Sequence, residues 1–341
     1  MRLEQLILGP VLVFVCALVA TGIIRRFALR TGLLDHPTNR SSHMRPTPRS
    51  GGGAIVIVFL AAMACIAGYG LLDTASVLAL ILAGASIAIV GFVDDRKSLP
   101  AATRLCVHVF AAILTVYVIG TERINILPNW APVGVFVFST LVFVSVVWST
   151  NLFNFMDGID GIAGSQAVFV AGAGALICGA VFGDFEMALA FACLAFATAG
   201  FLVWNWPPAK IFMGDVGSGF LGFTLAGMGL LASQRAGVPI AVWVILNGIF
   251  MVDATVTLLR RMLRGERWFE PHRLHAYQFL SRRWKKHLPV TLCVSTVNVA
   301  WLFPWAWFSA KHPGISLQIT FTAILPIVVL AFLCRAGAQE V

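Results

Sequence analysis

The sequence predicts an all-α, polytopic membrane protein with about eleven transmembrane helices, organised as a single transmembrane domain over residues 1–341. Of the 341 residues, 59% are hydrophobic and only 11% are charged, whereas a soluble domain has about 25% charged residues. The apolar segments are long and continuous rather than alternating, which favours helices over an outer-membrane barrel. Few residues remain outside these segments, so a separate soluble domain is not expected.

Each predicted helix is an apolar run close to the roughly 20 residues that a bilayer crossing requires. The runs at 76–93, 103–119 and 218–234 are short and give the weakest signal. The first run is followed by arginines rather than preceded by a basic segment, which predicts a span and not a cleaved signal peptide. In order, the candidate spans are 5–24, 52–70, 76–93, 103–119, 131–149, 162–182, 187–206, 218–234, 239–259, 288–308 and 315–334.

The basic residues predict the orientation of these spans. With the N-terminus outside, 20 of the 24 Lys and Arg residues fall on inside loops, and only Arg2, Arg123, Arg235 and Lys311 fall outside. This bias predicts an odd number of spans and a cytoplasmic C-terminus. The net charge of +9 partly reflects the same bias. Anionic lipids and phosphates are sufficient partners for such a face, so no nucleic-acid partner is inferred.

The stretch between two spans at 151–161 carries a polar group at every third residue: Asn151, Asn154, Asp157 and Asp160. Residues three apart on a helix are neighbours on one side, so the first three could line one helix end. Carboxylates and amides at a membrane surface are costly unless they face water, protein or a cation. Helix capping alone needs one such residue rather than four. The pattern therefore predicts an acidic site.

An aspartate pair, Asp94 and Asp95, closes the span 76–93 and is followed by Arg96 and Lys97. Adjacent carboxylates cannot both point the same way, so one could bind a cation while the other acts as a base. A solvated helix end explains a bare aspartate pair at least as well. The pair is informative only together with the other motifs.

A glycine-rich turn, Phe212 to Gly219, opens the span 218–234. Its glycines would let the backbone approach a phosphate, and the N–H groups at the start of the following helix favour an anion. Asp215 beside this turn suits a hard divalent cation that also touches phosphate oxygens. A plain glycine-rich turn is the alternative, and a P-loop is excluded because no Gly-Lys-Ser/Thr follows.

The longest inside loop contains His272, Arg273 and His275 in a basic context. Such groups beside a diphosphate would neutralise charge that develops in a transition state. A basic loop facing lipid headgroups explains these residues nearly as well. The loop at 35–53 is similarly basic and glycine-rich. Together the inside face suits Mg²⁺-dependent (or Mn²⁺-dependent) handling of a diphosphate at a membrane.

These motifs, in this order and on one predicted side, resemble those of the polyprenyl-phosphate N-acetylhexosamine-1-phosphate transferases, which are glycosyltransferase family 4. The family includes the enzymes that start O-antigen, common-antigen and teichoic-acid linkage synthesis, and the phospho-MurNAc-pentapeptide transferase. The resemblance runs from the 35–53 loop to His275. It implies that polyprenyl phosphate attacks the β-phosphate of a UDP-N-acetylhexosamine, UMP leaves and a lipid-diphosphate-sugar forms.

The resemblance also implies roles for individual residues. Asp94 would deprotonate or orient the lipid phosphate, Phe212 would stack on uracil and Asn205 would lie on the uridine side. Asp253, inside the span 239–259, matches an acidic residue of related chains. The expected metal ligands are Asp215 and Asn154. The expected catalytic residues are Asp94, Asp95, Asp157 and His275, and the expected substrate-binding residues are Asn205, Phe212, Asn151, Lys97 and Arg273.

Two departures from the family pattern bear on the substrate. Ser98 stands where the aspartate motif often has a third Asp, and Tyr277 and Gln278 stand where two histidines would be. The second form resembles O-antigen-initiating members that use N-acetylated 6-deoxyhexosamines such as FucNAc or QuiNAc, and it argues against the peptidoglycan enzyme.

The expected partners are a UDP-N-acetylhexosamine, polyprenyl phosphate and membrane lipids, with a homodimer left open. The expected location is the bacterial inner membrane, with the active site on the cytoplasmic face. The rival interpretation is a secondary transporter of a nucleotide-sugar or another anion. It predicts inverted repeats and paired broken helices at the midplane. No repeat is visible, and the ionisable residues gather at one face.

Overall fold

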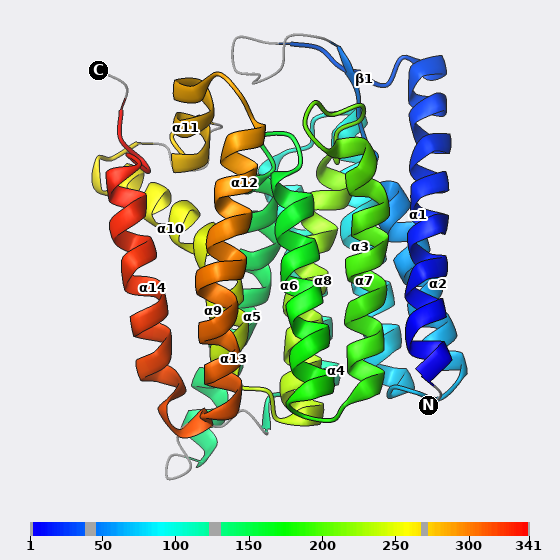
Figure 1. Cartoon of the computed structure of the whole chain (residues 1–341), viewed down its shortest axis with the longest axis vertical. Coiled ribbons are helices and arrows are strands. Elements are labelled where there is room, and N and C mark those ends of the chain that lie inside the picture. The colour runs from blue at the N-terminus through cyan, green and yellow to red at the C-terminus, as the bar shows by residue number, and fades with distance from the viewer. Residues whose placement is uncertain (1–2, 38–45, 123–130, 267–271, 340–341) are drawn as a thin grey trace.

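The computed structural model describes residues 3–37, 46–122, 131–266 and 272–339, which form an upright bundle of helices (Figure 1). Two short strands, β1 (Leu34–Asp35) and β2 (Thr47–Pro48), pair antiparallel at one end. The all-α prediction is confirmed. The helices are α1 (Leu3–Thr31), α2 (Gly53–Gly68), α3 (Thr74–Arg96), α4 (Ala101–Ile119), α5 (Ala131–Met156), α6 (Ile162–Ala180), α7 (Phe185–Asn205), α8 (Asp215–Ala236), α9 (Ile240–Leu246), α10 (Gly248–Leu263), α11 (Ala276–Trp284), α12 (Leu288–Val297), the π-helix η3 (Asn298–Leu302), α13 (Phe303–Lys311), the 3₁₀-helix η4 (Pro313–Ile315) and α14 (Ser316–Leu333).

Within the described ranges, nine helices are long and apolar enough to cross a membrane, and the bent pair α9 and α10 makes up to ten. The predicted span 52–70 corresponds to α2, an apolar helix of only 16 residues. The predicted span 239–259 is broken at Asn247 by a bend of 75°. Gln166 donates from its side-chain amide to the Leu246 carbonyl at this break (3.0 Å), which satisfies a backbone group that a continuous helix would have paired.

Helix α8 lies at the centre of the bundle. Its apolar segment is 94% buried, compared with 17% for α1 at the periphery. The close packing depends on small residues, because a side chain at Gly222 would overlap the Ser149 backbone and one at Gly217 would overlap Gly52. Ser149 reinforces the contact by donating its hydroxyl hydrogen bond to the Gly222 carbonyl at 2.7 Å.

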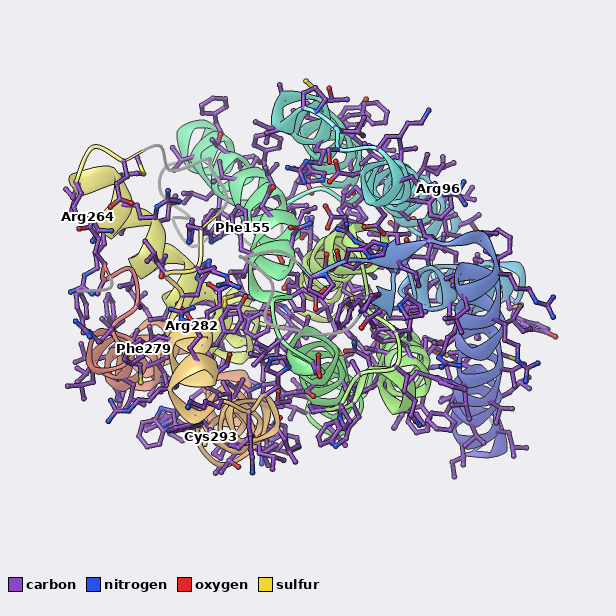
Figure 2. The ribbon with its side chains drawn as sticks, turned by 90° about the horizontal axis from the view of Figure 1, so that it is seen from above. Arg96, Phe155, Arg264, Phe279, Arg282 and Cys293 are labelled. Atoms are coloured by element: carbon purple, nitrogen blue, oxygen red, sulfur yellow. The ribbon has the colours of Figure 1, made fainter. Side chains whose placement is uncertain are left out.

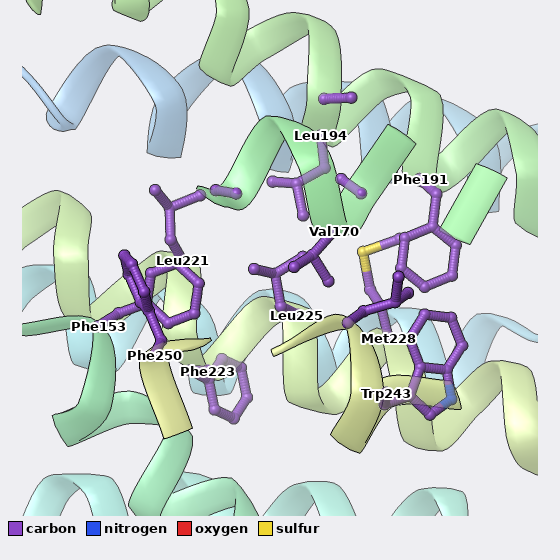
Figure 3. Close-up of a cluster of buried hydrophobic side chains, with 14 of the residues drawn as sticks. Phe153, Val170, Phe191, Leu194, Leu221, Phe223, Leu225, Met228, Trp243 and Phe250 are labelled. Atoms are coloured by element: carbon purple, nitrogen blue, oxygen red, sulfur yellow. The ribbon is translucent and has the colours of Figure 1, made fainter. Parts of the chain in front are cut away.

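Aromatic contacts connect the helices that carry the polar motifs. Phe153 of α5 packs against Phe250 of α10 with ring centroids 5.3 Å apart (Figure 3). Phe191 of α7 stacks on Trp243 of α9 at 5.1 Å, beside Met228 of α8. The end of α5 and the broken helix are therefore held in one apolar core.

The ends of the chain lie at opposite ends of the bundle, and β1 and α11 lie at the C-terminal end (Figure 1). At this end α5 continues beyond the predicted boundary at residue 149 to Met156. Asn151 and Asn154 are consequently helical, and Asp157 is the first residue after the helix. The elongated helix thus delivers the 151–161 motif to the same end as α11.

Candidate active site

A cleft of about 770 Å³ opens at the end of the bundle that carries α11, and it is lined by both acidic and basic side chains. It contains six of the residues predicted from the sequence: Asn154, Asp157, Asn205, Phe212, Asp215 and Arg273. The other five predicted residues, Asp94, Asp95, Asn151, Lys97 and His275, are not part of its lining. Asn151 donates to the Val147 carbonyl of its own helix (2.8 Å), and Lys97 is exposed after the end of α3.

Asp157 is the carboxylate of the cleft that the protein leaves unpaired. Among the residues that the structure describes, none donates a hydrogen bond to its carboxylate or forms a salt bridge with it. Burial, and next to it the negative charge of Asp215, raise the pKa of the Asp157 carboxyl well above its ordinary value. The position therefore favours a cation or a proton.

Asp95, in contrast, is fully enclosed. Its Oδ1 accepts from the Asp215 backbone N–H (2.8 Å) and contacts Arg49 Nε (3.0 Å), while its Oδ2 accepts from the Ser50 hydroxyl (2.7 Å). The carboxylate sits where a Cβ on Gly214 would be, at the N-terminus of α8. The anion predicted at this glycine-rich helix start is therefore the side chain of Asp95 and not a phosphate, which corrects that prediction.

Two arginines connect the aspartates of α3 to Asp215. Arg49 contacts Asp95 and Asp215 (3.3 Å for the second), and Arg104 contacts Asp94 at 2.9 Å and Asp215 at 3.2 Å. Burial disfavours the charged form of Arg49, but the carboxylates of Asp95 and Asp215 outweigh it, so the pKa of Arg49 lies above its ordinary value. The arginines let three like charges lie close together.

Asp160 holds the turn after Asp157. Its Oδ2 accepts from the Ala209 backbone N–H at 3.0 Å and lies 3.2 Å from His287 Nδ1. Its carbonyl accepts from the Thr291 hydroxyl at 3.0 Å. Asp160 therefore joins the 157–161 loop to the loop that follows α7 and to α12, which is a structural role.

Asn205 connects the same loops from the other side. Its Oδ1 accepts from the Gly161 N–H (3.1 Å), and its Nδ2 donates to the Ile211 carbonyl (3.0 Å). The side chain is almost fully buried, although the residue borders the cleft. Both polar ends of the amide are engaged with backbone, so Asn205 holds in place the backbone next to Phe212.

A second part of the lining is formed by α11 and the residues after it, with Gln278, Ser281, Arg282, Lys285 and His287 bordering the cleft beside the 157–160 segment. Figure 2 looks onto this end of the bundle, with Arg282 of α11 and Phe155 at the end of α5 on one side and Arg96 of α3 on the other. The cleft therefore presents cationic groups and carboxylates together. This distribution suits a ligand that is anionic and is held through a cation.

His275 lies behind the α11 wall rather than in the cleft. Its side chain is 4% exposed, and Nδ1 lies 3.4 Å from Asp253 Oδ1. Asp253 also accepts from the backbone N–H groups of Ala276 and Tyr277 at 2.9 and 3.2 Å. In this structure His275 contacts the residues that position α11.

The residues present fit a Mg²⁺ ion that is shared with phosphates. In the described part of the chain, no three His, Cys, Asp or Glu side chains are close enough to hold a metal by themselves. Mg²⁺ does not need such a set, because it usually binds one or two carboxylates together with substrate phosphates and water. The unpaired carboxylate of Asp157 beside Asp215, with the Asn154 amide in the same cleft, meets that requirement.

Several residues of this end were missed by sequence reasoning. Arg49 and Arg104 were counted only as inside positive charges, as were Arg282 and Lys285, and His287 was given no role. Arg104 follows Asp94 by ten residues across a helix break, a separation at which no local pattern indicates contact. Arg49 lay in a loop recognised as basic and glycine-rich, which was the one available signal.

Comparison with known sequences adds to this geometry. The family model described as glycosyl transferase family 4 matches residues 77–233, a segment that runs from the first turn of α3 to near the end of α8 and ends before α11. A Bacillus subtilis protein named probable undecaprenyl-phosphate N-acetylglucosaminyl 1-phosphate transferase is 26% identical over 97% of this chain and 92% of its own length.

Two further relatives have similar coverage. A Mycobacterium tuberculosis protein named decaprenyl-phosphate N-acetylglucosaminephosphotransferase is 30% identical over 86% of this chain and 80% of its own length. A Halalkalibacterium halodurans protein named phospho-N-acetylmuramoyl-pentapeptide-transferase is 28% identical over 82% of this chain and 89% of its own length. These alignments extend beyond the 77–233 segment.

Proposed function

The chain belongs to the polyprenyl-phosphate N-acetylhexosamine-1-phosphate transferases of glycosyl transferase family 4, and on this basis we propose its donor, its cofactor and the roles of its cleft residues. It is a multi-pass membrane protein that transfers a hexosamine 1-phosphate to a polyprenyl phosphate. The proposed donor is a UDP-N-acetylhexosamine, and the proposed products are UMP and a lipid-diphosphate-sugar. The observation that carries this proposal is that the Asp157 carboxylate, which has no partner among the described residues, shares one cleft with the basic side chains of α11 and the residues after it.

The charges of the cleft support a nucleotide diphosphate as ligand. Arg273, Arg282 and Lys285 are suited to the negative charge of the diphosphate, and Phe212 offers an aromatic ring for the uracil base. The side chain of Asn205 holds the backbone at Ile211, the residue before Phe212. We therefore assign Phe212 and Arg273 to substrate binding and Asn205 to the support of the uridine side.

The proposed cofactor is Mg²⁺, which Mn²⁺ could replace. Asp215, Asp157 and Asn154 would hold it, and it would supply neutralisation of the diphosphate charge. Arg49 and Arg104 already hold Asp215 in place through salt bridges at 3.3 and 3.2 Å. These residues orient the Asp215 carboxylate whatever ligand is present.

The acceptor phosphate forms the new bond to the β-phosphorus, and the bond from that phosphorus to the UMP oxygen breaks. Asp94 is proposed to take or orient the acceptor's proton, since its carboxylate is only partly enclosed and lies beside Arg104, a group able to attract a phosphate. Asp95 supports this arrangement by fixing Asp215 and the start of α8. Lys97, exposed nearby, is proposed to attract the lipid phosphate at the membrane surface.

The proposed identity of the sugar is based on the sequence of the α11 segment. Tyr277 and Gln278 stand where two histidines of the family pattern would be, which supports an N-acetylated 6-deoxyhexosamine such as FucNAc or QuiNAc as donor. The product would start a lipid-linked polysaccharide such as O-antigen. The concentration of basic residues at the cleft end supports a cytoplasmic active site in the bacterial inner membrane.

The test is a donor panel with the purified full-length protein in lipid nanodiscs that contain undecaprenyl phosphate. UDP-GlcNAc, UDP-GalNAc, UDP-FucNAc, UDP-QuiNAc and UDP-MurNAc-pentapeptide are each supplied with Mg²⁺, and UMP release and the lipid product are measured. We expect turnover with a UDP-N-acetylhexosamine, greatest for a 6-deoxy donor, and loss of turnover when EDTA is added. Restoration by excess Mg²⁺ or Mn²⁺ is the control for chelation.

Two outcomes would contradict parts of the proposal separately. Full turnover in EDTA would remove the metal from the mechanism but leave the transfer reaction. Turnover only with UDP-GlcNAc would remove the 6-deoxy donor and leave the reaction class.

A further inference from the structure

Asp253 is buried in α10 and does not line the cleft. It is 4% exposed. Its oxygens accept from the backbone N–H groups of Ala276 and Tyr277 at 2.9 and 3.2 Å, and from the Thr257 hydroxyl at 3.2 Å. His275 Nδ1 is the remaining neighbour, at 3.4 Å. A buried carboxylate that accepts from these groups stabilises the segment to which they belong.

That element is the start of α11. The first N–H groups of a helix have no acceptor within the helix, and a carboxylate at this end is favourable. Helix α11 has only nine residues, too few to be stable without tertiary contacts. Because Asp253 belongs to α10, the place where α11 begins is determined by α10.

Tyr277 connects the start of α11 to the end of α5, which Asp157 directly follows. Its hydroxyl donates to the Phe155 carbonyl at 3.0 Å, in the last turn of α5, where carbonyls lack partners within the helix. A Cβ on Gly158 would overlap the same hydroxyl, so the loop passes directly against it. Burial, followed by the charge of Asp253, raises the pKa of Tyr277 well above its ordinary value, so the hydroxyl keeps its proton and remains a donor.

We propose that Asp253 and Tyr277 are positioning residues that fix the Asp157 carboxylate relative to the basic residues of α11 that border the same cleft. The chain of contacts runs from Asp253 to the start of α11, from Tyr277 to the end of α5, and from there over two residues to Asp157. Neither side chain lines the cleft. The inference rests on the proposed function, because it assigns Asp157 and α11 to the binding of one diphosphate.

The experiment compares Tyr277→Phe, which removes only the hydroxyl, and Asp253→Asn, which keeps the shape of the side chain. The matched controls are Tyr69→Phe, at an exposed tyrosine, and Asp73→Asn, at an aspartate that caps α3 at the opposite end of the bundle. Steady-state kcat and KM for donor and acceptor are measured in nanodiscs. Amide hydrogen exchange is measured by mass spectrometry without substrate.

We expect Tyr277→Phe and Asp253→Asn each to lower kcat by about ten- to a hundredfold, because small misplacements of reacting groups are costly. KM for the donor should change little. Amide exchange over residues 155–161 is expected to become faster in both variants and in neither control. The double variant should be no less active than the less active of the two single variants, because both changes break one chain of contacts. If Asp253→Asn does not accumulate in membranes, Tyr277→Phe decides alone.

Unchanged exchange at 155–161 in the folded variants overturns the inference, whatever happens to kcat. Losses that multiply in the double variant overturn it as well, because independent effects multiply. Exchange needs no substrate, so failure of the proposed function is seen separately, as a wild-type protein that forms no lipid-linked sugar with any donor.

Discussion

Two aspartate motifs at the cleft end look alike in sequence, yet their surroundings are opposite. Asp95 receives a backbone N–H, a serine hydroxyl and an arginine, and its side chain is wholly enclosed. Within the described residues Asp157 receives none of these and borders the cleft. A carboxylate whose acceptor positions are filled by the protein stabilises the fold, whereas an unpaired one in a cleft is available to a ligand. The contrast separates residues that build the site from residues that use it.

The strongest test of this contrast is Asp157→Asn. The change keeps the shape of the side chain but removes the charge that would hold a cation and orient the diphosphate. We expect turnover to fall by about a hundredfold or more. The free energy of unfolding should not decrease, because burial and the negative charge of Asp215 already disfavour the charged form of this carboxyl in the folded protein. UMP release and thermal unfolding are measured on the same nanodisc preparation.

Asp184→Asn is the matched control for Asp157→Asn. Asp184 caps α7 at the far end of the bundle and pairs with Arg235, so its loss should leave kcat unchanged. Near-normal turnover in Asp157→Asn would break the contrast, because it would mean that the unpaired carboxylate is not used.

Asp95→Ala should give the reverse result. It leaves Arg49 Nε, the Ser50 hydroxyl and the Asp215 backbone N–H without their shared acceptor, while Arg49 keeps its contact with Asp215. Donors left without an acceptor cost about 1–3 kcal/mol of stability. Activity should fall as well, since Asp215 loses its support. The measurement is the free energy of unfolding by denaturant in detergent, compared with Asp94→Ala, whose carboxylate is less enclosed. A fully stable Asp95→Ala protein without activity would favour a direct chemical role.

The sequence predicted the helices well because burial in a bilayer is read from composition alone. It failed at the span 239–259, where the structure bends at Asn247 and Gln166 from another helix satisfies the freed carbonyl. Hydropathy contains no information on such a distant partner. The short α2 was overestimated for a similar reason, since apolar residues that pack on other helices resemble those that face lipid.

The candidate site was predicted in part. The three-residue period correctly grouped Asn154 with Asp157 at the cleft, but it also included Asn151, which bonds within α5. The helix start at residues 214–219 was correctly seen to favour an anion, but the chain supplies that anion itself from Asp95. Composition and spacing show which groups need a partner, and the packing of distant segments decides which partner they find.

Asp160→Asn provides the smallest and most discriminating test, because Asp160 belongs to the same motif as Asp157 and lies three residues after it. Its Oδ2 accepts from the Ala209 N–H and contacts His287, and an asparagine oxygen can retain the first of these interactions. We expect a loss of about 1 kcal/mol in the free energy of unfolding, with only a small loss of turnover. If the motif were one uniform acidic patch, the two substitutions would reduce kcat equally. The observed contacts require a much larger reduction at Asp157, since only that carboxylate has no partner within the described residues.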